Sequence, residues 1–339
     1  MTTQTFSFST ASVKYYFDAG FDLLQKLVPI EQSVLLTDEN IFSKHKKRFK
    51  GWKTIVIKAG EAHKNQSTVD EIIRQLIETG ADRKTILIGI GGGVITDITG
   101  YVAGIFLRGI SFGFVPTSIL AMVDASVGGK NGVDVGLYKN MVGLIRQPSF
   151  ILYDYSFLKS LPKDEWVNGF AEIIKHAAIK DAAMFKILEE SKLTIFQKEV
   201  KAIAKLVQRN VLIKTKVVVN DEFEGGERKL LNFGHTLGHA IENLYQIPHG
   251  HAISIGMGQS CKISEKLAGF KETERVTRLL KQYGLPPRFD FDKERAFDIL
   301  LKDKKKAGQH ISFILLKKIG KAEIRSLSLE DLHTIFQQL

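Results

Sequence analysis

Strand-like apolar runs alternate with helical patterns over the first 155 residues of the chain. Helical patterns cover 67–79 and a stretch that ends near residue 106. The strand-like runs lie at 33–38, 53–58, 85–90, 111–115 and 150–154. Because strands that alternate with helices form parallel sheets covered on both faces, residues 1–155 are predicted to fold as a doubly wound α/β domain.

From about residue 158 the pattern is almost wholly helical, which predicts a second, mainly α-helical domain over residues 156–339. We expect the two domains to pack around a cleft. Helices fit 163–180, 182–191, 196–218, 231–246, 250–268, 272–282 and 293–305, and a strand pair at 310–316 and 321–326 precedes a final helix near 328–338.

The formal charge is +11, from 48 basic and 37 acidic residues. The basic runs are short and scattered, as at 44–48, 302–306 and 317–318. Nucleic-acid binders concentrate such charge in one stripe, so this class is excluded, and an anionic substrate remains a use for part of the charge.

The single cysteine, Cys261, excludes a disulfide framework and favours a reducing compartment. The N-terminus lacks a basic segment followed by an apolar run, and every apolar stretch is shorter than a membrane span. We therefore expect a cytoplasmic protein that does not interact with membranes.

Four of the nine histidines lie within residues 230–257. His235 and His239 are four residues apart and share one face of a predicted helix, as zinc ligands often do. His249 and His251 follow in and after a Pro-containing turn. The spacing does not say which three bind a metal, and isolated helical histidines are usually structural.

Glu172 lies on a predicted helix among apolar neighbours, where a carboxylate needs a partner. A metal held by this glutamate and two histidines would keep an open position for catalysis. A salt bridge to Lys175 explains the residue equally well.

The triple glycine at 91–93 stands where a strand meets a helix, and such a junction binds phosphate through its backbone N–H groups. The dinucleotide pattern G-x-G-x-x-G fails at Val94, so a plain tight turn is the alternative. Asp38 ends a strand and suits a ribose hydroxyl, although it also fits an ordinary turn. Residues 124–134, followed by Lys139 and Asn140, form a polar, Gly-rich segment that is predicted to be a loop. This loop is either functional or simply solvated.

Taken together, these motifs resemble the 3-dehydroquinate synthase family of sugar-phosphate cyclases. The motifs are Gly60-Glu61 with Lys64, GGGVITD (91–97), Arg108-Gly109, VPTSILAMVDASVGGK (115–130), Lys139-Asn140, AEIIK (171–175), NDEFEGGERKLLNFGHTLGHAIE (220–242) and HGHAISIGM (249–257).

The resemblance implies a Rossmann-like N-terminal domain, bound NAD and one divalent metal, Zn²⁺ or Co²⁺, held by Glu172, His235 and His249. It implies NAD contacts from Asp38, Glu61, Lys64, Gly92, Gly93, Val94, Asp97, Thr117, Ser118, Lys130 and Lys139. It implies substrate contacts from Asp124, Lys130, Asn140, Lys175, Lys214, Arg228, Asn232, His239 and Lys304. It also implies a homodimer in which Arg108 reaches the neighbouring active site.

The implied reaction is that of the shikimate pathway, which leads to chorismate and the aromatic amino acids. It converts 3-deoxy-arabino-heptulosonate 7-phosphate to 3-dehydroquinate and phosphate. The steps are transient oxidation by NAD, phosphate elimination, re-reduction and intramolecular aldol cyclisation. The alternatives are another cyclase, such as 2-deoxy-scyllo-inosose synthase or one acting on sedoheptulose 7-phosphate, a metal-dependent alcohol dehydrogenase, or a non-catalytic NAD-binding module. Asn131, Ser118 and residues 135–138 depart from the family pattern.

Overall fold

The computed structural model describes residues 1–136, 138–304 and 310–337, without the side chains of 302–304. Contacts between residues divide the chain into two compact units. The first unit contains Met1–Glu165 and Glu199–Glu222, and the second contains Trp166–Lys198 and Phe223–Leu339.

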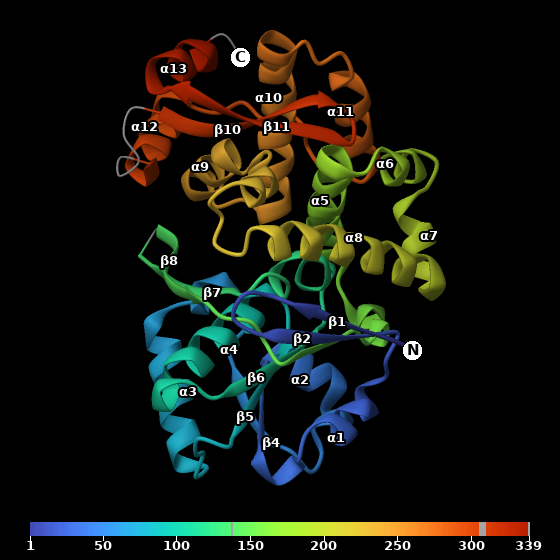
Figure 1. The fold of residues 1–339 in the computed structure, drawn as a ribbon, viewed down its shortest axis with the longest axis vertical. Coiled ribbons are helices and arrows are strands. Elements are labelled where there is room, and N and C mark those ends of the chain that lie inside the picture. The colour runs from blue at the N-terminus through green and yellow to red at the C-terminus, as the bar shows by residue number, and fades with distance from the viewer. Residues whose placement is uncertain (137, 305–309, 338–339) are drawn as a thin grey trace. The chain divides into compact units, whose positions relative to one another are not determined.

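A seven-stranded sheet forms the centre of the first unit, in the order β1-β2-β9-β6-β5-β3-β4 (Figure 1). The six strands from β2 to β4 are parallel, and β1 adds an antiparallel edge. The strands are β1 (Thr2–Ser7), β2 (Ser12–Phe17), β3 (Ser33–Asp38), β4 (Lys53–Ile57), β5 (Ile86–Gly91), β6 (Ser111–Pro116) and β9 (Phe150–Leu152). The predicted parallel α/β sheet is confirmed.

Both faces of this sheet are covered. Helix α4 (Gly93–Ile105) packs against β5 and β6, and α3 (Gln66–Glu78) contacts α4 and β4. On the other face, Leu35 and Ile88 join an apolar cluster with the short helix α1 (Leu24–Leu27). Buried parallel strands therefore read as continuous apolar runs, as the sequence pattern indicated.

Part of the predicted polar loop is a strand pair. β7 (Lys130–Val135) and β8 (Tyr138–Ile145) are antiparallel, and β7 packs against α4. The loop prediction for residues 130–134 is therefore wrong. Glycine, asparagine and aspartate have poor strand propensity, and packing against α4 outweighs that propensity here.

Helix α8 (Val200–Asn220) belongs to the first unit although the chain has by then entered its helical half. It contacts β1 and the short π-helix η6 (Ala121–Ala125). Its buried face includes Leu206 and Val211, and Thr215 Oγ1 lies 3.3 Å from Tyr15 Oη. The sequence pattern gives no sign of this return to the first unit, because the contacts join distant residues, 90 apart for Asp124 and Lys214 and 200 apart for Tyr15 and Thr215.

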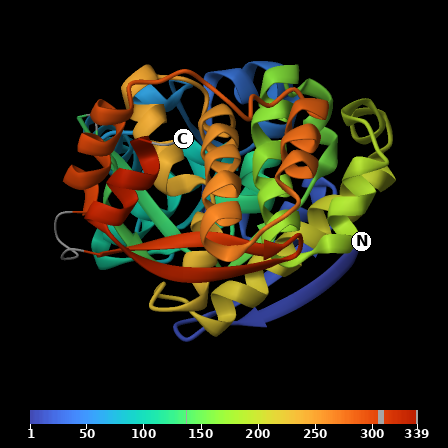
Figure 2. The same ribbon diagram turned by 90° about the horizontal axis from the view of Figure 1, so that it is seen from above.

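The second unit is mainly helical, as predicted, with one antiparallel strand pair (Figures 1 and 2). Leu237 and Ile241 of α9, Ile255 of α10 and Phe313 and Leu315 of β10 share its core. The elements are α5 (Lys163–Lys180), α6 (Ala182–Glu189), α7 (Leu193–Lys198), α9 (His235–Tyr245), α10 (His249–Ala268), α11 (Thr273–Gln282), α12 (Lys293–Lys304), β10 (His310–Lys318), β11 (Lys321–Ser328) and α13 (Leu329–Gln337).

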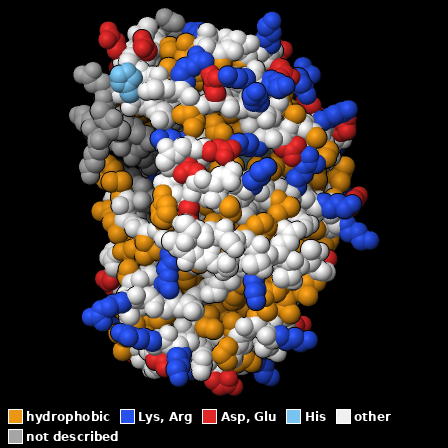
Figure 3. All heavy atoms as spheres, in the orientation of Figure 1, with side chains coloured by type: hydrophobic (Ala, Val, Ile, Leu, Met, Phe, Trp, Pro, Cys, Tyr) orange, Lys and Arg blue, Asp and Glu red, His pale blue; other side chains and the backbone are white. Residues whose placement is uncertain are grey.

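Lys and Arg side chains are scattered among polar and apolar atoms on the face drawn in Figure 3. Across the described ranges, no helix has both the length and the apolar character needed to cross a membrane.

Candidate active site

A buried carboxylate on α5 is the centre of the candidate metal site. Glu172 is fully buried, and Lys175, one turn later on the same helix face, is only 1% exposed. The two side chains form an ion pair. Both Glu172 oxygens lack a hydrogen-bond donor of suitable geometry among the described residues. The carboxylate therefore has electron pairs that a cation would use.

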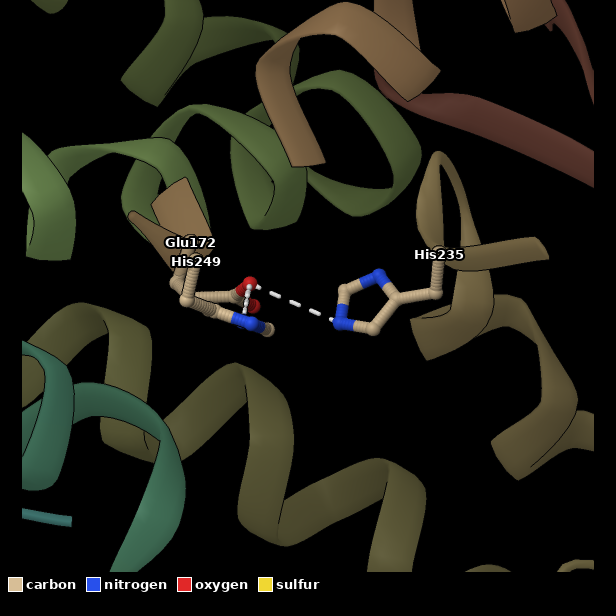
Figure 4. A group of neighbouring side chains, drawn as sticks. All are labelled: Glu172, His235 and His249. Carbon is tan, nitrogen blue, oxygen red and sulfur yellow. Dashed lines mark ion pairs between the residues drawn. The ribbon is translucent and has the colours of Figure 1, made fainter. Parts of the chain in front are cut away.

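Two histidines approach this carboxylate from the first residues of α9 and α10 (Figure 4). His235 Nε2 lies 3.6 Å and His249 Nε2 lies 3.5 Å from Glu172 Oε1. Glycines bring the two helices together, because a Cβ at Gly256 would lie 1.9 Å from the carbonyl oxygen of Gly234. Close packing of α9 and α10 thus places both imidazoles beside Glu172.

One ligand atom from each of Glu172, His235 and His249 lies within 4.8 Å of the others. A carboxylate oxygen and two imidazole nitrogens are a usual donor set for Zn²⁺ and for similar divalent ions. The residues present therefore fit a single divalent metal with one open position.

Glu172 and His235 have protonation states that suit a metal ligand, whereas His249 does not. Burial would raise the pKa of Glu172, but Lys175 and the histidines together lower that pKa well below its usual range. Burial and Lys175 lower the pKa of His235 well below its ordinary value, so its imidazole is neutral. Burial opposes charge on His249 as well, but the neighbouring carboxylates of Glu172 and Glu242 raise its pKa to about 9. A metal would have to displace this proton.

His239 lies beside the other two rings, with ring centroids 5.1 Å from His235 and 6.1 Å from His249. A second group of ligand atoms, from His239, Glu242 and His249, also falls within 4.8 Å. Three of the four clustered histidines are therefore in one place, and among the described residues of the second unit geometry alone leaves two candidate trios. His251 lies two residues into α10.

Other predicted substrate residues of the second unit lie on or near a 3₁₀ turn, η8 (Glu227–Asn232). Arg228 is buried, and Asn232 Nδ2 donates to Glu224 Oε1 at 2.6 Å. Lys304 ends α12, and its side chain lies outside the described residues.

In the first unit, the carboxyl ends of β3 and β5 place Asp38 and the triple glycine at the same edge of the sheet. Asp38 Oδ1 accepts the backbone N–H of Ile41, which caps α2 (Glu39–His45). The residues at 92 and 93 are open: a Cβ at Gly92 would meet only Ser118 Oγ at 3.5 Å, and one at Gly93 only Ala125 Cβ at 3.5 Å.

Gly89 and Gly91 are different, because a Cβ at either would lie 2.4 Å from a side chain of α4. These two glycines serve the packing of helix on strand, whereas Gly92 and Gly93 leave space at an uncapped helix N-terminus. That space, beside the backbone N–H groups of the first helical turn, fits the phosphates of a dinucleotide.

Lys64 is buried, and its Nζ lies 2.6 Å from Asp97 Oδ2 and 2.6 Å from Asn140 Oδ1. Burial disfavours the ammonium, but Asp97 and Glu61 outweigh it and raise the pKa of Lys64. Lys139 Nζ lies 3.4 Å from Glu61 Oε1. The structure thus brings five predicted site residues together.

The remaining predicted residues of this unit have simpler surroundings. Lys214 Nζ lies 2.7 Å from Asp124 Oδ1, and Ser118 Oγ accepts the N–H of Ala121 at 3.2 Å. Thr117 is buried beside Gly91, Val94 lies in the first turn of α4, and Lys130 is exposed on β7. Arg108 is exposed in the 3₁₀ turn that follows α4, η5 (Phe106–Arg108), with a left-handed φ of 66°.

The sequence did not predict two residues that contact predicted site residues. Asp134 Oδ1 accepts the N–H of Asn140 at 2.7 Å and supports its left-handed backbone, φ 54°. Glu242 Oε2 lies 3.2 Å from His249 Nδ1. In the sequence, only the polar character of its segment pointed to Asp134. Glu242 belongs to the family motif at 220–242, but the sequence assigned it no role.

An α/β unit with an open glycine junction and a helical unit with a Glu/His/His cluster define a class of metal- and nucleotide-binding enzymes. The sequence model of the 3-dehydroquinate synthase N-terminal region matches residues 54–168, and that of its C-terminal region matches residues 169–306. The chain belongs to the 3-dehydroquinate synthase family, whose members are carbon–oxygen lyases.

Curated relatives agree with this assignment. The chain is 41% identical over 293 residues to 3-dehydroquinate synthase of Thermodesulfovibrio yellowstonii, covering 84% of this chain and 81% of the relative. It is 39% identical over 323 residues to that of Clostridium acetobutylicum, covering 91% and 90%.

Solved structures share the fold. A 2-deoxy-scyllo-inosose synthase complexed with carbaglucose-6-phosphate, NAD⁺ and Co²⁺ has a TM-score of 0.87 at 23% identity, with 99% of both chains covered. The 2-epi-5-epi-valiolone synthase of Streptomyces hygroscopicus, with NAD⁺ and Zn²⁺ bound, also scores 0.87, at 24% identity, covering 99% of this chain and 97% of that one.

Proposed function

We propose that this protein is a 3-dehydroquinate synthase, which converts 3-deoxy-arabino-heptulosonate 7-phosphate to 3-dehydroquinate and phosphate in the shikimate pathway. The observation that carries the proposal is the Glu172, His235 and His249 cluster. This cluster lies in a chain that matches both halves of the family.

We infer that NAD binds the first unit and a divalent metal binds the second. Bound NAD supplies a hydride acceptor that is restored at the end of the cycle. A bound divalent ion acts as a Lewis acid on a substrate hydroxyl. NAD⁺ with Co²⁺ or Zn²⁺ in the two related cyclases supports both assignments. The open positions at Gly92 and Gly93 and the cluster at Glu172 support them from this chain's own residues.

Buried basic side chains suit a substrate that carries a carboxylate and a phosphate. Lys175 is buried in an ion pair with Glu172, and Arg228 is buried on η8. A buried arginine binds a carboxylate in two parallel hydrogen bonds, whereas a lysine acts as a point charge. Lys175 and Asn232 are two of the substrate contacts that the family resemblance implies, and we take both to favour the heptulosonate substrate over other sugar phosphates.

We also propose that the chain acts as a cytoplasmic homodimer in which Arg108 reaches the neighbouring active site. Leu107 and Arg108 are exposed in consecutive left-handed conformations, φ 51° and 66°. Left-handed backbone at two exposed non-glycine residues supports a functional surface at this turn. The one cysteine, buried and unpaired, supports a reducing compartment.

The test is phosphate release from 3-deoxy-arabino-heptulosonate 7-phosphate with NAD and Zn²⁺ present, followed together with NADH absorbance. Phosphate release without net NADH, abolished in His235→Ala, is the expected result. Steady accumulation of NADH would mean a dehydrogenase instead. Turnover of sedoheptulose 7-phosphate alone would assign the same chemistry to another sugar.

A further inference from the structure

The two histidines of the proposed metal site differ in what holds their second nitrogen. His235 Nδ1 lies 3.2 Å from the carbonyl oxygen of Phe233, a neutral acceptor. His249 Nδ1 lies 3.2 Å from Glu242 Oε2, a carboxylate. In both rings the other nitrogen, Nε2, points toward Glu172 Oε1. Each imidazole therefore has an oxygen beside its Nδ1, but only in His249 does that oxygen belong to a carboxylate.

Glu242 reaches His249 because Glu242 lies on the same face of α9 as His235. His235 and Glu242 are seven residues apart, which is two helical turns, so both project toward the start of α10. Glu242 is only 4% exposed. A carboxylate buried to this extent costs stability unless it is hydrogen-bonded or paired, and His249 Nδ1 is one partner that repays this cost.

We propose that Glu242 is a positioning residue for the metal site, which fixes His249 with its proton on Nδ1 and its Nε2 electron pair toward the metal. The inference rests on the proposed function, because it takes Glu172, His235 and His249 as the ligands. Imidazole has one free electron pair when neutral, so the partner on one nitrogen decides which nitrogen binds metal. A carboxylate partner also makes Nε2 a stronger donor than an amide would.

A positioning role for Glu242 and a purely structural role predict different results. A structural carboxylate would hold α9 to α10 whether or not a metal is bound, and its loss would change stability without changing metal affinity. A positioning carboxylate changes the affinity of the folded protein. The rival arrangement is a cation held directly by His239, Glu242 and His249, whose ligand atoms are also close together. In that arrangement His249 would bind through Nδ1.

The first experiment measures Zn²⁺ affinity of the metal-free full-length chain by competition with a chromophoric chelator, without substrate. Glu242→Gln is expected to bind Zn²⁺ about 10- to 100-fold more weakly than the wild type. The matched control is Glu222→Gln, another buried carboxylate, 5% exposed, that belongs to the first unit. The control is expected to keep the wild-type affinity. Equal affinity of Glu242→Gln and wild type would overturn the proposal.

A second experiment needs no variant of Glu242 and so does not depend on its folding. ¹⁵N-labelled histidine in the Zn²⁺-loaded protein is expected to show His249 protonated at Nδ1 and coordinated at Nε2, with its signals assigned by their loss in His249→Gln. Coordination at Nδ1 would overturn the proposal in favour of the rival trio. Both readouts omit substrate, so they separate this inference from the proposed reaction: a wild type that releases no phosphate while Glu242→Gln still loses affinity refutes only the reaction.

Discussion

Gly100 of α4 is in direct contact with the side chain of Asn131 on β7: a Cβ at position 100 would lie 1.8 Å from Asn131 Oδ1. Asn131 Nδ2 in turn donates to the carbonyls of Gly129 at 2.7 Å and Arg146 at 3.0 Å. The asparagine that departs from the family pattern therefore links the residue before β7 and the residue after β8 to α4. We interpret the departure as an alternative packing solution.

Gly100→Ala is expected to destabilise the protein although alanine favours helices. The clash with a buried, hydrogen-bonded side chain costs about 1–3 kcal/mol, against a gain of up to about 1 kcal/mol in helix propensity. Urea unfolding measures the difference. Gly20→Ala, where a Cβ meets nothing within 4 Å, is the control and should be nearly neutral.

The same contact predicts a coupling. In Asn131→Ala the space beside Gly100 is empty, so adding Gly100→Ala should cost less than it does in the wild type. The double mutant is expected to be more stable than the sum of the single changes by about 0.5–3 kcal/mol. Additive effects would show that the two positions do not interact.

The sequence predicts the parallel sheet because its strands are buried on both faces and read as continuous apolar runs. It does not predict β7 and β8, because Gly132 and Gly143 argue against a strand. In the structure these glycines let the two backbones approach closely, since a Cβ at Gly132 would lie 2.6 Å from the carbonyl oxygen of Val142. The low strand propensity of glycine therefore argued against the two strands, whereas the close packing of their backbones requires glycine.

The candidate site was predictable to the same limited degree. Spacing alone brought His235 and His239 to one helix face. The apolar neighbours of Glu172 predicted either a metal site or a salt bridge, and only the family resemblance chose Glu172, His235 and His249 as the ligands. The approach of these side chains depends on the contact between Gly234, just before α9, and Gly256 of α10, which no local sequence pattern predicts. Glu242 escaped for the same reason, because its partner lies on the next helix.

Lys64 and Asp97 form a buried pair, and removing one member should cost more than removing both. Lys64→Met leaves the Asp97 carboxylate without its ammonium at 2.6 Å, a loss of about 3–5 kcal/mol. Lys64→Met with Asp97→Asn is expected to recover part of that stability, because no unpaired charge remains. Thermal and urea unfolding of the three proteins measure this. A double variant less stable than Lys64→Met would contradict it.

Glu222 gives the first unit a dependence on pH. Burial opposes ionisation, but hydrogen bonds from Ser9, Gln147 and Thr10 outweigh it and lower the pKa of Glu222. A lowered pKa adds stability that is present above the ordinary glutamate value, about 4.3, and is lost as the pH falls through the lowered value.

Glu222→Gln is therefore expected to lose about 1–3 kcal/mol at pH 7, because an amide has one acceptor oxygen for donors that now reach both carboxylate oxygens. The gap between variant and wild type should narrow as the pH falls below the ordinary glutamate value and the wild-type Glu222 begins to bind a proton. Unfolding free energies from pH 3 to pH 7 test this. A constant gap would mean that Glu222 does not titrate with folding.

Paired histidine variants test the choice between the two candidate trios. His235→Gln should lose Zn²⁺ at concentrations that saturate the wild type, whereas His239→Gln should retain it and lose turnover. The reason is that His235 Nε2 faces Glu172 Oε1 at 3.6 Å, and His239 belongs only to the other group. Metal content after dialysis against a weak chelator measures the difference. The reverse order would assign the metal to His239, Glu242 and His249.

Arg108 is expected to complete the active site of a neighbouring subunit, and mixed dimers test this directly. Arg108→Ala and His235→Ala should each be inactive, but subunits exchanged between them should form one intact site per mixed dimer. Random exchange then restores roughly a quarter of the wild-type phosphate release. A mixture of His235→Ala with Lys175→Ala is the control and should stay inactive, because both residues lie together in one subunit. If the Arg108→Ala mixture also stayed inactive while mixed dimers formed, Arg108 would act within its own subunit, and its exposed, left-handed turn would need another explanation.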